Sequence, residues 1–166
     1  MQVYALRFCR LTVLDYRYSA LSMKSPDASF VPRDITSPPA LVQPQWKNAP
    51  YPTWVFEVAH RNEDWNRLKT DARTKAFSAQ TSIQVFVGVK IYSKHFRVFW
   101  AKRSPVGFGM RIQRTSPKLL INQPTAITFN IPATLIFWGW PNIPPLPSAT
   151  FPLKLDVLRL SIVDYM

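Results

Sequence analysis

Cysteine, histidine and glycine are all scarce in this 166-residue sequence, and each shortage excludes something. The single cysteine, Cys9, cannot form a disulfide within the chain, and with only two histidines it leaves too few ligands for a structural zinc site. An intracellular, reducing setting is therefore expected, in the cytoplasm or the nucleus. Four glycines are too few for the turns, so Pro, Asn, Asp and Ser are expected to make most of them.

Long apolar runs are also absent. No stretch approaches the roughly 18 consecutive apolar residues of a membrane-spanning helix, so no membrane span is expected. The first 14 residues are the part most similar to a signal peptide, but Arg7 and Arg10 interrupt them and no small-residue cleavage site follows. This segment is more typical of a strand. The length suits a single domain over residues 1–166.

Acidic residues are the fourth shortage, and they leave the chain strongly basic. Nine Asp and Glu against 21 Lys and Arg give a formal net charge of +12. Such a charge favours polyanionic partners, nucleic acid above all, and no membrane partner is expected. A basic protein without such a partner is the alternative, because net charge governs association rather than fold.

Sixteen prolines, gathered mainly in residues 26–52 and 141–152, predict loops at these two places. Between and after the loops, apolar alternation predicts strands rather than helices. The predicted strands cover residues 54–59, 83–92, 96–100, 108–114, 127–131 and 134–138. The short turn between the second and third of these predicts a hairpin, and Ile83, Val85, Val87, Val89 and Ile91 are expected on one face.

One helix is predicted, over residues 64–77, with Asn62 or Asp64 as its N-cap. Its apolar residues recur at helical spacing and would form one stripe: Trp65, Leu68, Ala72 and Ala76. A strand, a helix and further strands predict an α/β fold in which the helix packs on a mixed sheet, followed by a β-rich C-terminal part.

Two carboxylates stand out by their surroundings. Asp27 opens the short apolar segment Ser25-Pro26-Asp27-Ala28-Ser29-Phe30-Val31, and Glu57 interrupts the strand Trp-Val-Phe-Glu-Val-Ala. A carboxylate within an apolar strand is costly to bury unless it is paired, hydrogen-bonded or bound to a metal. The alternative is that strand alternation points Glu57 to a solvent-exposed face.

Together these two segments resemble the paired signature of the Uma-type restriction endonuclease family, which belongs to the PD-(D/E)XK nuclease superfamily. The similarity covers residues 15–103 and is weak beyond them. It implies a restriction-endonuclease-like core and a Mg²⁺-dependent DNA endonuclease, with Asp27 and Glu57 as metal ligands. Mg²⁺ takes one or two carboxylates besides phosphate and water oxygens. The two carboxylates are accordingly expected on adjacent strands, about 4 to 6 Å apart.

The chain departs from this pattern at the lysine. Ala59 stands two residues after Glu57, where the superfamily usually has lysine, and the position aligned with the family's helix lysine holds Asp71. Lys69 and Lys75 are the candidates on the helix, and Lys69 is favoured because it is nearer the helix start. Each has the alternative of a solvated basic face. The short segment before Asp27 suggests a truncated or degenerate copy.

Three classes of function therefore stay open: a nuclease, an inactive nucleic-acid-binding module of the same fold, and a protein-interaction domain. A homodimer also stays open. Among the remaining candidates, His60, His95 and Asp34 are expected to be turn or loop residues. Trp138 and Trp140 could stack on bases, although frequent aromatic residues are usually core.

Overall fold

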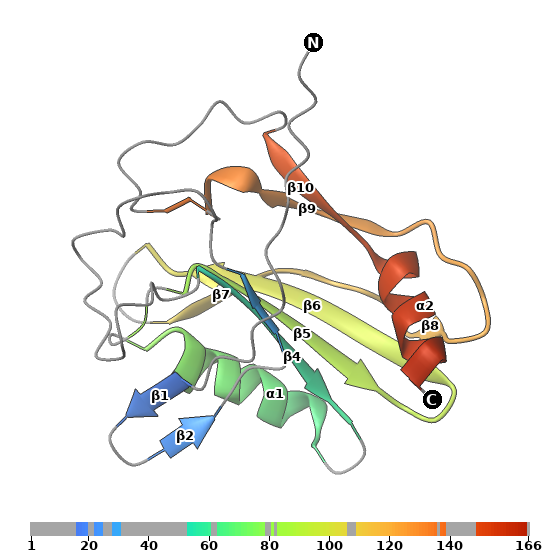
Figure 1. Cartoon of the computed structure of the whole chain (residues 1–166), viewed down its shortest axis with the longest axis horizontal. Helices are drawn as coiled ribbons and strands as arrows, with labels where there is room; N and C mark the ends of the chain where they lie inside the picture. The colour runs from blue at the N-terminus through green and yellow to red at the C-terminus, as the bar shows by residue number, and fades with distance from the viewer. Residues whose placement is uncertain are drawn as a thin grey trace.

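The computed structural model describes residues 16–19, 22–24, 28–30, 53–60, 63–78, 81, 83–105, 109–135, 137–138 and 149–165. Within these residues the fold is α/β, with one mixed sheet, a helix packed on it and a second, smaller sheet (Figure 1). A separate hairpin pairs β1 (Tyr16–Ser19) with β2 (Ser22–Lys24).

The main sheet has the strand order β3-β4-β5-β6-β7, with β8 also paired to β6. Its strands are β3 (Ala28–Phe30), β4 (Trp54–Ala59), β5 (Val85–Ile91), β6 (His95–Arg103), β7 (Met110–Thr115) and β8 (Leu119–Leu120). Only β4 and β5 run parallel, because a helical crossover joins them, while the other neighbours are antiparallel. The predicted hairpin is confirmed as β5–β6, with a first strand shorter and a second strand longer than expected.

The crossover between β4 and β5 is α1 (Trp65–Asp71), which continues as the π-helical turn η1 (Ala72–Ala76). Asp64 is the N-cap, as one of the two predicted alternatives had it: its carboxylate accepts a 2.7 Å hydrogen bond from the backbone N–H of Arg67. The predicted apolar stripe is confirmed, since Leu68, Ala72 and Ala76 are buried on the sheet and Trp65 packs at the edge of that cluster.

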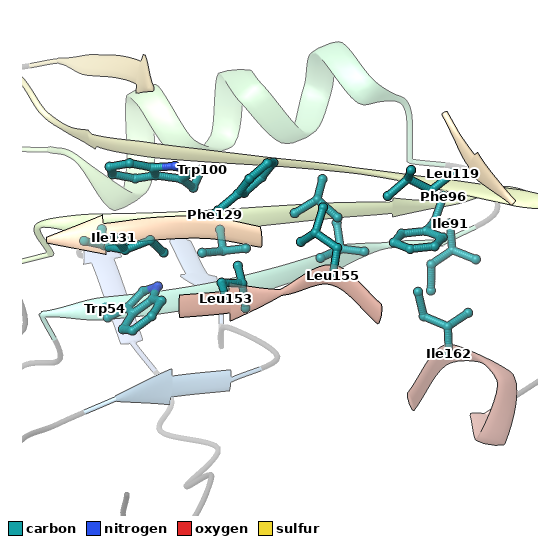
Figure 2. Packing of buried hydrophobic residues seen from close by; sticks show 14 of the residues in the cluster. Trp54, Ile91, Phe96, Trp100, Leu119, Phe129, Ile131, Leu153, Leu155 and Ile162 are labelled. Atoms are coloured by element: carbon teal, nitrogen blue, oxygen red, sulfur yellow. The ribbon is translucent and has the colours of Figure 1, made fainter. Parts of the chain in front are cut away.

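The opposite face of the main sheet is covered by the small antiparallel sheet of β9 (Thr128–Pro132) and β10 (Thr150–Lys154), followed by α2 (Leu155–Tyr165). Figure 1 shows these elements on the side of the sheet away from α1. Figure 2 shows how the large apolar side chains fill the space between them, with Trp54 and Trp100 on the sheet facing Phe129, Ile131 and Leu153. This is the larger of the two apolar clusters.

Strand β5 is buried along its whole length because both of its faces are covered. Val85, Val87, Val89 and Ile91 point to β9 and β10, which confirms four of the five residues predicted on one face. Ile83 precedes the strand and packs with the helix instead. The residues between them, Phe86, Gly88 and Lys90, therefore face α1.

Only glycine fits at position 88, because the ring of Phe99 on β6 occupies the space that a side chain would need. A Cβ at Gly88 would lie 2.3 Å from Cε1 of Phe99 and 3.0 Å from Cδ2 of Leu68. We expect Gly88→Ala to lower the free energy of unfolding by about 1–3 kcal/mol, because overpacking forces ring and helix apart. Chemical denaturation measures the loss. The double variant Gly88→Ala/Phe99→Leu should regain part of it, and equal losses in both variants would contradict the proposed clash.

Arg103, at the end of β6, ties the end of the helix to the sheet. Its guanidinium donates hydrogen bonds to the backbone carbonyls of Phe77 (3.3 Å), Ser78 (3.1 Å), Thr81 (2.8 Å) and Ile83 (2.9 Å), and to the Thr81 hydroxyl (2.8 Å). It also lies 5.8 Å from the centre of the Phe77 ring. Burial lowers the pKa of Arg103 from its usual range.

One expectation for the C-terminal part is wrong. The strand predicted over 134–138 does not form in the part of it that is described, because the β9–β10 ladder ends at the pair Pro132 and Thr150 and a 3-10 turn, η2 (Ala133–Leu135), follows. The C-terminal part contains the strands β9 and β10, and the helix α2, which was not predicted, follows them. In the regions that the structure describes, no helix has the length and apolar character needed to cross a membrane.

Candidate functional site

Glu57 lies on the helix side of the main sheet and is buried, with 4% of its surface exposed. Its neighbours two positions away along β4, Val55 and Ala59, pack in the same cluster as Leu68 of α1. The solvent-facing alternative for Glu57 is therefore wrong, because the helix covers the face to which alternation points it. A carboxylate in such a place requires polar or cationic compensation.

Lys90 is the nearest cationic position on the neighbouring strand. The parallel register pairs Glu57 with Gly88 and Ala59 with Lys90, so Lys90 lies diagonally across from Glu57 on the same face. Strand spacing and rise put their Cα atoms about 8 Å apart. Lys90 is also buried, at 4% exposed, and its ammonium lies 5.3 Å from the centre of the Tyr92 ring.

A second cation, Arg97 of β6, pairs directly with Lys90 across the next ladder. Its guanidinium carbon lies 4.5 Å from the centre of the Trp65 ring, at the start of α1. The Nε atom of Arg97 is buried and has no hydrogen-bond partner in the described part of the chain. Trp65 itself is held edge-on against Phe99, with ring centres 5.2 Å apart.

Lys69 completes the group, which we call the Glu57 cluster: Glu57, Lys69, Lys90 and Arg97 around Trp65. The ammonium of Lys69 lies 5.9 Å from the Trp65 ring centre, and the side chain is half-buried. The register thus places Lys90 near Glu57, while Lys69 and Arg97 meet at the Trp65 ring. Their excess positive charge, in a partly dehydrated place, attracts anions such as phosphate.

The other lysine predicted on the helix has an ordinary structural partner. Lys75 forms a 2.6 Å ion pair with Asp71, four residues earlier on the same helix. This pairing accounts for Lys75 and separates it from the Glu57 cluster. Lys69 and Arg97 lie over the same Trp65 ring, and the predicted reach of Lys69 to Glu57 and Asp27 stays a prediction.

Asp27 lies outside the described residues, so its predicted distance to Glu57 stays a prediction. The described part of β3 begins one residue later, where Ala28 pairs with Phe56, the residue before Glu57. Strands β3 and β4 are antiparallel neighbours. The described residues therefore show β3 beside β4, and the distance between the two predicted metal ligands stays a prediction.

The remaining candidates take simple roles. His60 is exposed just after β4, and His95 starts β6 in the hairpin, stacked on Tyr92 with ring centres 4.3 Å apart. Trp138 is 39% exposed, whereas Trp140 and Asp34 lie outside the described residues. The contacts described for His60, His95 and Trp138 do not include a residue of the Glu57 cluster.

Glu57 is the predicted metal ligand that lies within the described residues. Across the described ranges, no group of three or more His, Cys, Asp and Glu side chains could hold a metal ion. Glu57 alone is compatible with Mg²⁺, because Mg²⁺ keeps several waters and is bound through one or two carboxylates plus phosphate oxygens. A metal at Glu57 therefore requires a second carboxylate or the phosphate itself.

Lys90 and Arg97 are the residues that sequence reasoning missed. Lys90 belongs to an apolar strand and Arg97 to its hairpin partner, and neither has a motif around it. The signal that could have found Lys90 is its place as a single cation in the otherwise apolar run Val-Phe-Val-Gly-Val-Lys-Ile.

A comparison of the chain with family models, with curated proteins and with solved structures gives no match.

Proposed function

We propose that this chain is a metal-dependent DNA endonuclease with a restriction-endonuclease-like core, which hydrolyses phosphodiester bonds at the Glu57 cluster. The observation that carries the proposal is a buried carboxylate on a sheet strand, with Lys90 diagonally across from it on β5 and two further cations, Lys69 and Arg97, at the Trp65 ring. Such a site offers oxygen for a hard metal and positive charge for a phosphate. The cations would bind and orient the phosphate group.

In this proposal Asp27 and Glu57 hold the divalent metal. The register of β3 supports the pair, because Ala28 lies opposite Phe56 and the chain neighbours of these two residues are Asp27 and Glu57. A bound Mg²⁺ would polarise the phosphate and lower the pKa of an attacking water. The protein's own part is to hold the two carboxylates together and to exclude bulk water from the buried side.

We further propose that Lys90 supplies the ammonium group that the position of Ala59 lacks. Ala59 and Lys90 are register partners on neighbouring strands, so a lysine on β5 can serve the same point as a lysine on β4. Lys69 stays the alternative, since it approaches the same cluster from α1. Either ammonium would stabilise the charge that develops on the phosphate.

Lys90→Met and Lys69→Met distinguish these two lysines. We expect Lys90→Met to lower the turnover number on duplex DNA by about 100-fold, because removing one charged donor from a transition state has an effect of this size. DNA affinity should change only a few-fold. Lys69→Met should keep turnover within about three-fold of the unaltered chain. Single-turnover kinetics and melting temperatures of both variants provide the comparison.

The reverse pattern would assign the role to Lys69, and normal turnover in both variants would remove the helix and β5 lysines from the mechanism. The nuclease proposal itself is tested on supercoiled plasmid with Mg²⁺ or Mn²⁺, against EDTA. Cleavage only with metal supports it. Binding of DNA without cleavage under any divalent metal would instead support the inactive nucleic-acid-binding module, which the net charge of +12 favours.

A further inference from the structure

The middle of the chain carries an unusual charge distribution. Residues 72–155 contain eleven Lys and Arg and not one Asp or Glu. These residues form η1, the strands β5 to β10 and their connections. A surface built from them has no carboxylate of its own to offset its cations, so its field is positive wherever those cations are exposed.

Several of these cations lie on the edge strand β7, beside β8, or on the adjoining part of β6 and its hairpin turn. We call this set the basic edge: Lys94, Lys102, Arg111, Arg114 and Lys118. Four of them are exposed and Lys102 is half-buried. They follow the full length of β6, whose nine residues span about 27 Å. The basic edge is separate from the Glu57 cluster, which lies toward β4.

The register brings cations together at one end of this edge. Lys102 pairs directly with Arg111, and Trp100 pairs with Arg114. These pairs put all three cations on the side of the sheet that faces β9, where the guanidinium of Arg114 lies 5.9 Å from the centre of the Phe129 ring. Like charges placed opposite each other in a ladder are destabilising without a counter-charge. An external anion would supply it.

We propose that the basic edge binds the phosphate backbone of a nucleic acid strand that runs along β7 and β8. This inference rests on the proposed function, because it names the surface on which the DNA substrate lies. A span of about 27 Å matches about eight phosphates at 3.4 Å per nucleotide of one strand. Contacts from Lys and Arg to phosphates position the strand without reading its sequence.

A role in preventing aggregation or in binding a membrane would have different consequences for the basic edge. Charged side chains on an edge strand prevent pairing between molecules. Acidic side chains could serve this role as well as basic ones, so it does not explain a row of cations alone. An anionic membrane would attract the same cations, but surface-binding elements usually present aromatic or apolar anchors beside them. Neither β7 nor β8 contains an aromatic residue, and their exposed apolar residues, Ile112 and Leu120, alternate with residues of the β9 side and so point to the other face of the sheet from Arg111 and Arg114. The linear row therefore fits a nucleic acid strand better than a membrane.

The test compares two double variants with the same change in net charge, Arg111→Glu/Arg114→Glu on the basic edge and Arg67→Glu/Arg73→Glu on the exposed side of the helix. All four side chains are exposed. Binding of a fluorescent 20-base-pair DNA is measured by anisotropy, with EDTA present, over a series of salt concentrations. We expect the edge variant to bind at least 10-fold more weakly. The slope of log K against log salt is negative, and its magnitude should decrease by about 1.8, because each lost phosphate contact removes about 0.9.

The helix variant should stay within about three-fold of the unaltered chain. Equal weakening of both double variants would overturn the proposal, since net charge alone would account for it, and so would unchanged binding by the edge variant. Vesicles containing phosphatidylserine form a further arm: loss of vesicle binding with DNA binding intact would overturn the proposal in favour of a membrane. Because EDTA prevents metal-dependent cleavage, the absence of nuclease activity would leave this result standing.

Discussion

Glu57→Gln is expected to lower metal-dependent DNA cleavage by about a thousand-fold while the protein stays folded. Glutamine keeps the shape of the buried side chain but removes the negative charge that a divalent cation requires. Losing a metal's stabilisation of the transition state has an effect of several kcal/mol, and about 4 kcal/mol corresponds to a thousand-fold. Initial rates on supercoiled plasmid with Mg²⁺ measure the effect, and a melting curve shows whether the variant stays folded.

Glu63→Gln is the matched control, because Glu63 is a nearby acid outside the Glu57 cluster and is only half-buried. We expect it to cleave as the unaltered chain does. A direct measurement of Mn²⁺ binding by calorimetry should show the Glu57 variant weakened and the Glu63 variant unchanged. If the Glu57 variant is fully active, the buried carboxylate has a structural role and the proposed metal site is wrong.

Arg103→Met is expected to lower the free energy of unfolding by about 3 kcal/mol, the largest stability effect that we predict. Hydrogen bonds from a charged group are each worth about 1.5–3 kcal/mol, and the buried carbonyls of Phe77, Thr81 and Ile83 would lose their donor. The effects of the bonds do not add, because large single-residue losses above 4–5 kcal/mol are exceptional. The melting temperature should fall by roughly 6–12 °C in a domain of this size.

Arg111→Met is a suitable control for stability, since Arg111 is exposed on β7 and its replacement removes the same charge. Its melting temperature should stay within about 2 °C of the unaltered chain, as expected for exposed positions. Arg103→Lys should fall between the two, because an ammonium cannot reach the several carbonyls that the planar guanidinium reaches. Equal melting temperatures for Arg103→Met and Arg111→Met would show that the hydrogen bonds contribute little.

The sequence was sufficient for those parts of the fold that depend on local pattern. Asp64 could be identified as an N-cap, and Trp65, Leu68, Ala72 and Ala76 could be placed on one helix face, because capping and helical periodicity act within a few residues. The alternation of Val85, Val87 and Val89 similarly fixed the face of β5 that meets β9 and β10.

Two features of the C-terminal part were not predicted correctly: the helix α2 and the end of the strand β9. Helix α2 could have been predicted from the spacing of Leu155, Leu158 and Ile162, all of which pack on the larger cluster. No helix or strand was assigned to this segment from the sequence. The missing strand at 134–138 depends on where β10 begins, at Thr150, and that pairing is not visible in local pattern.

The candidate site divides in the same way. Glu57 was identified by its apolar context, but its burial depended on α1 covering that face of the sheet. Lys90 was missed because its importance comes from the register between β4 and β5, which sets it beside Ala59. No rule of sequence spacing gives the register of two parallel strands joined by a crossover, since the crossover length does not determine it.

The order of strands in the main sheet has a consequence for how the chain folds. The antiparallel ribbon β5–β6–β7 joins near neighbours in sequence, so its loop-closure entropy is small. Pairing of β4 with β5 must await the α1 crossover, and pairing of β3 with β4 must close the 23 residues between Phe30 and Trp54. We therefore expect the ribbon, with Phe99 already seated over Gly88, to act as the folding nucleus, and β3 to be the last strand of the sheet to dock.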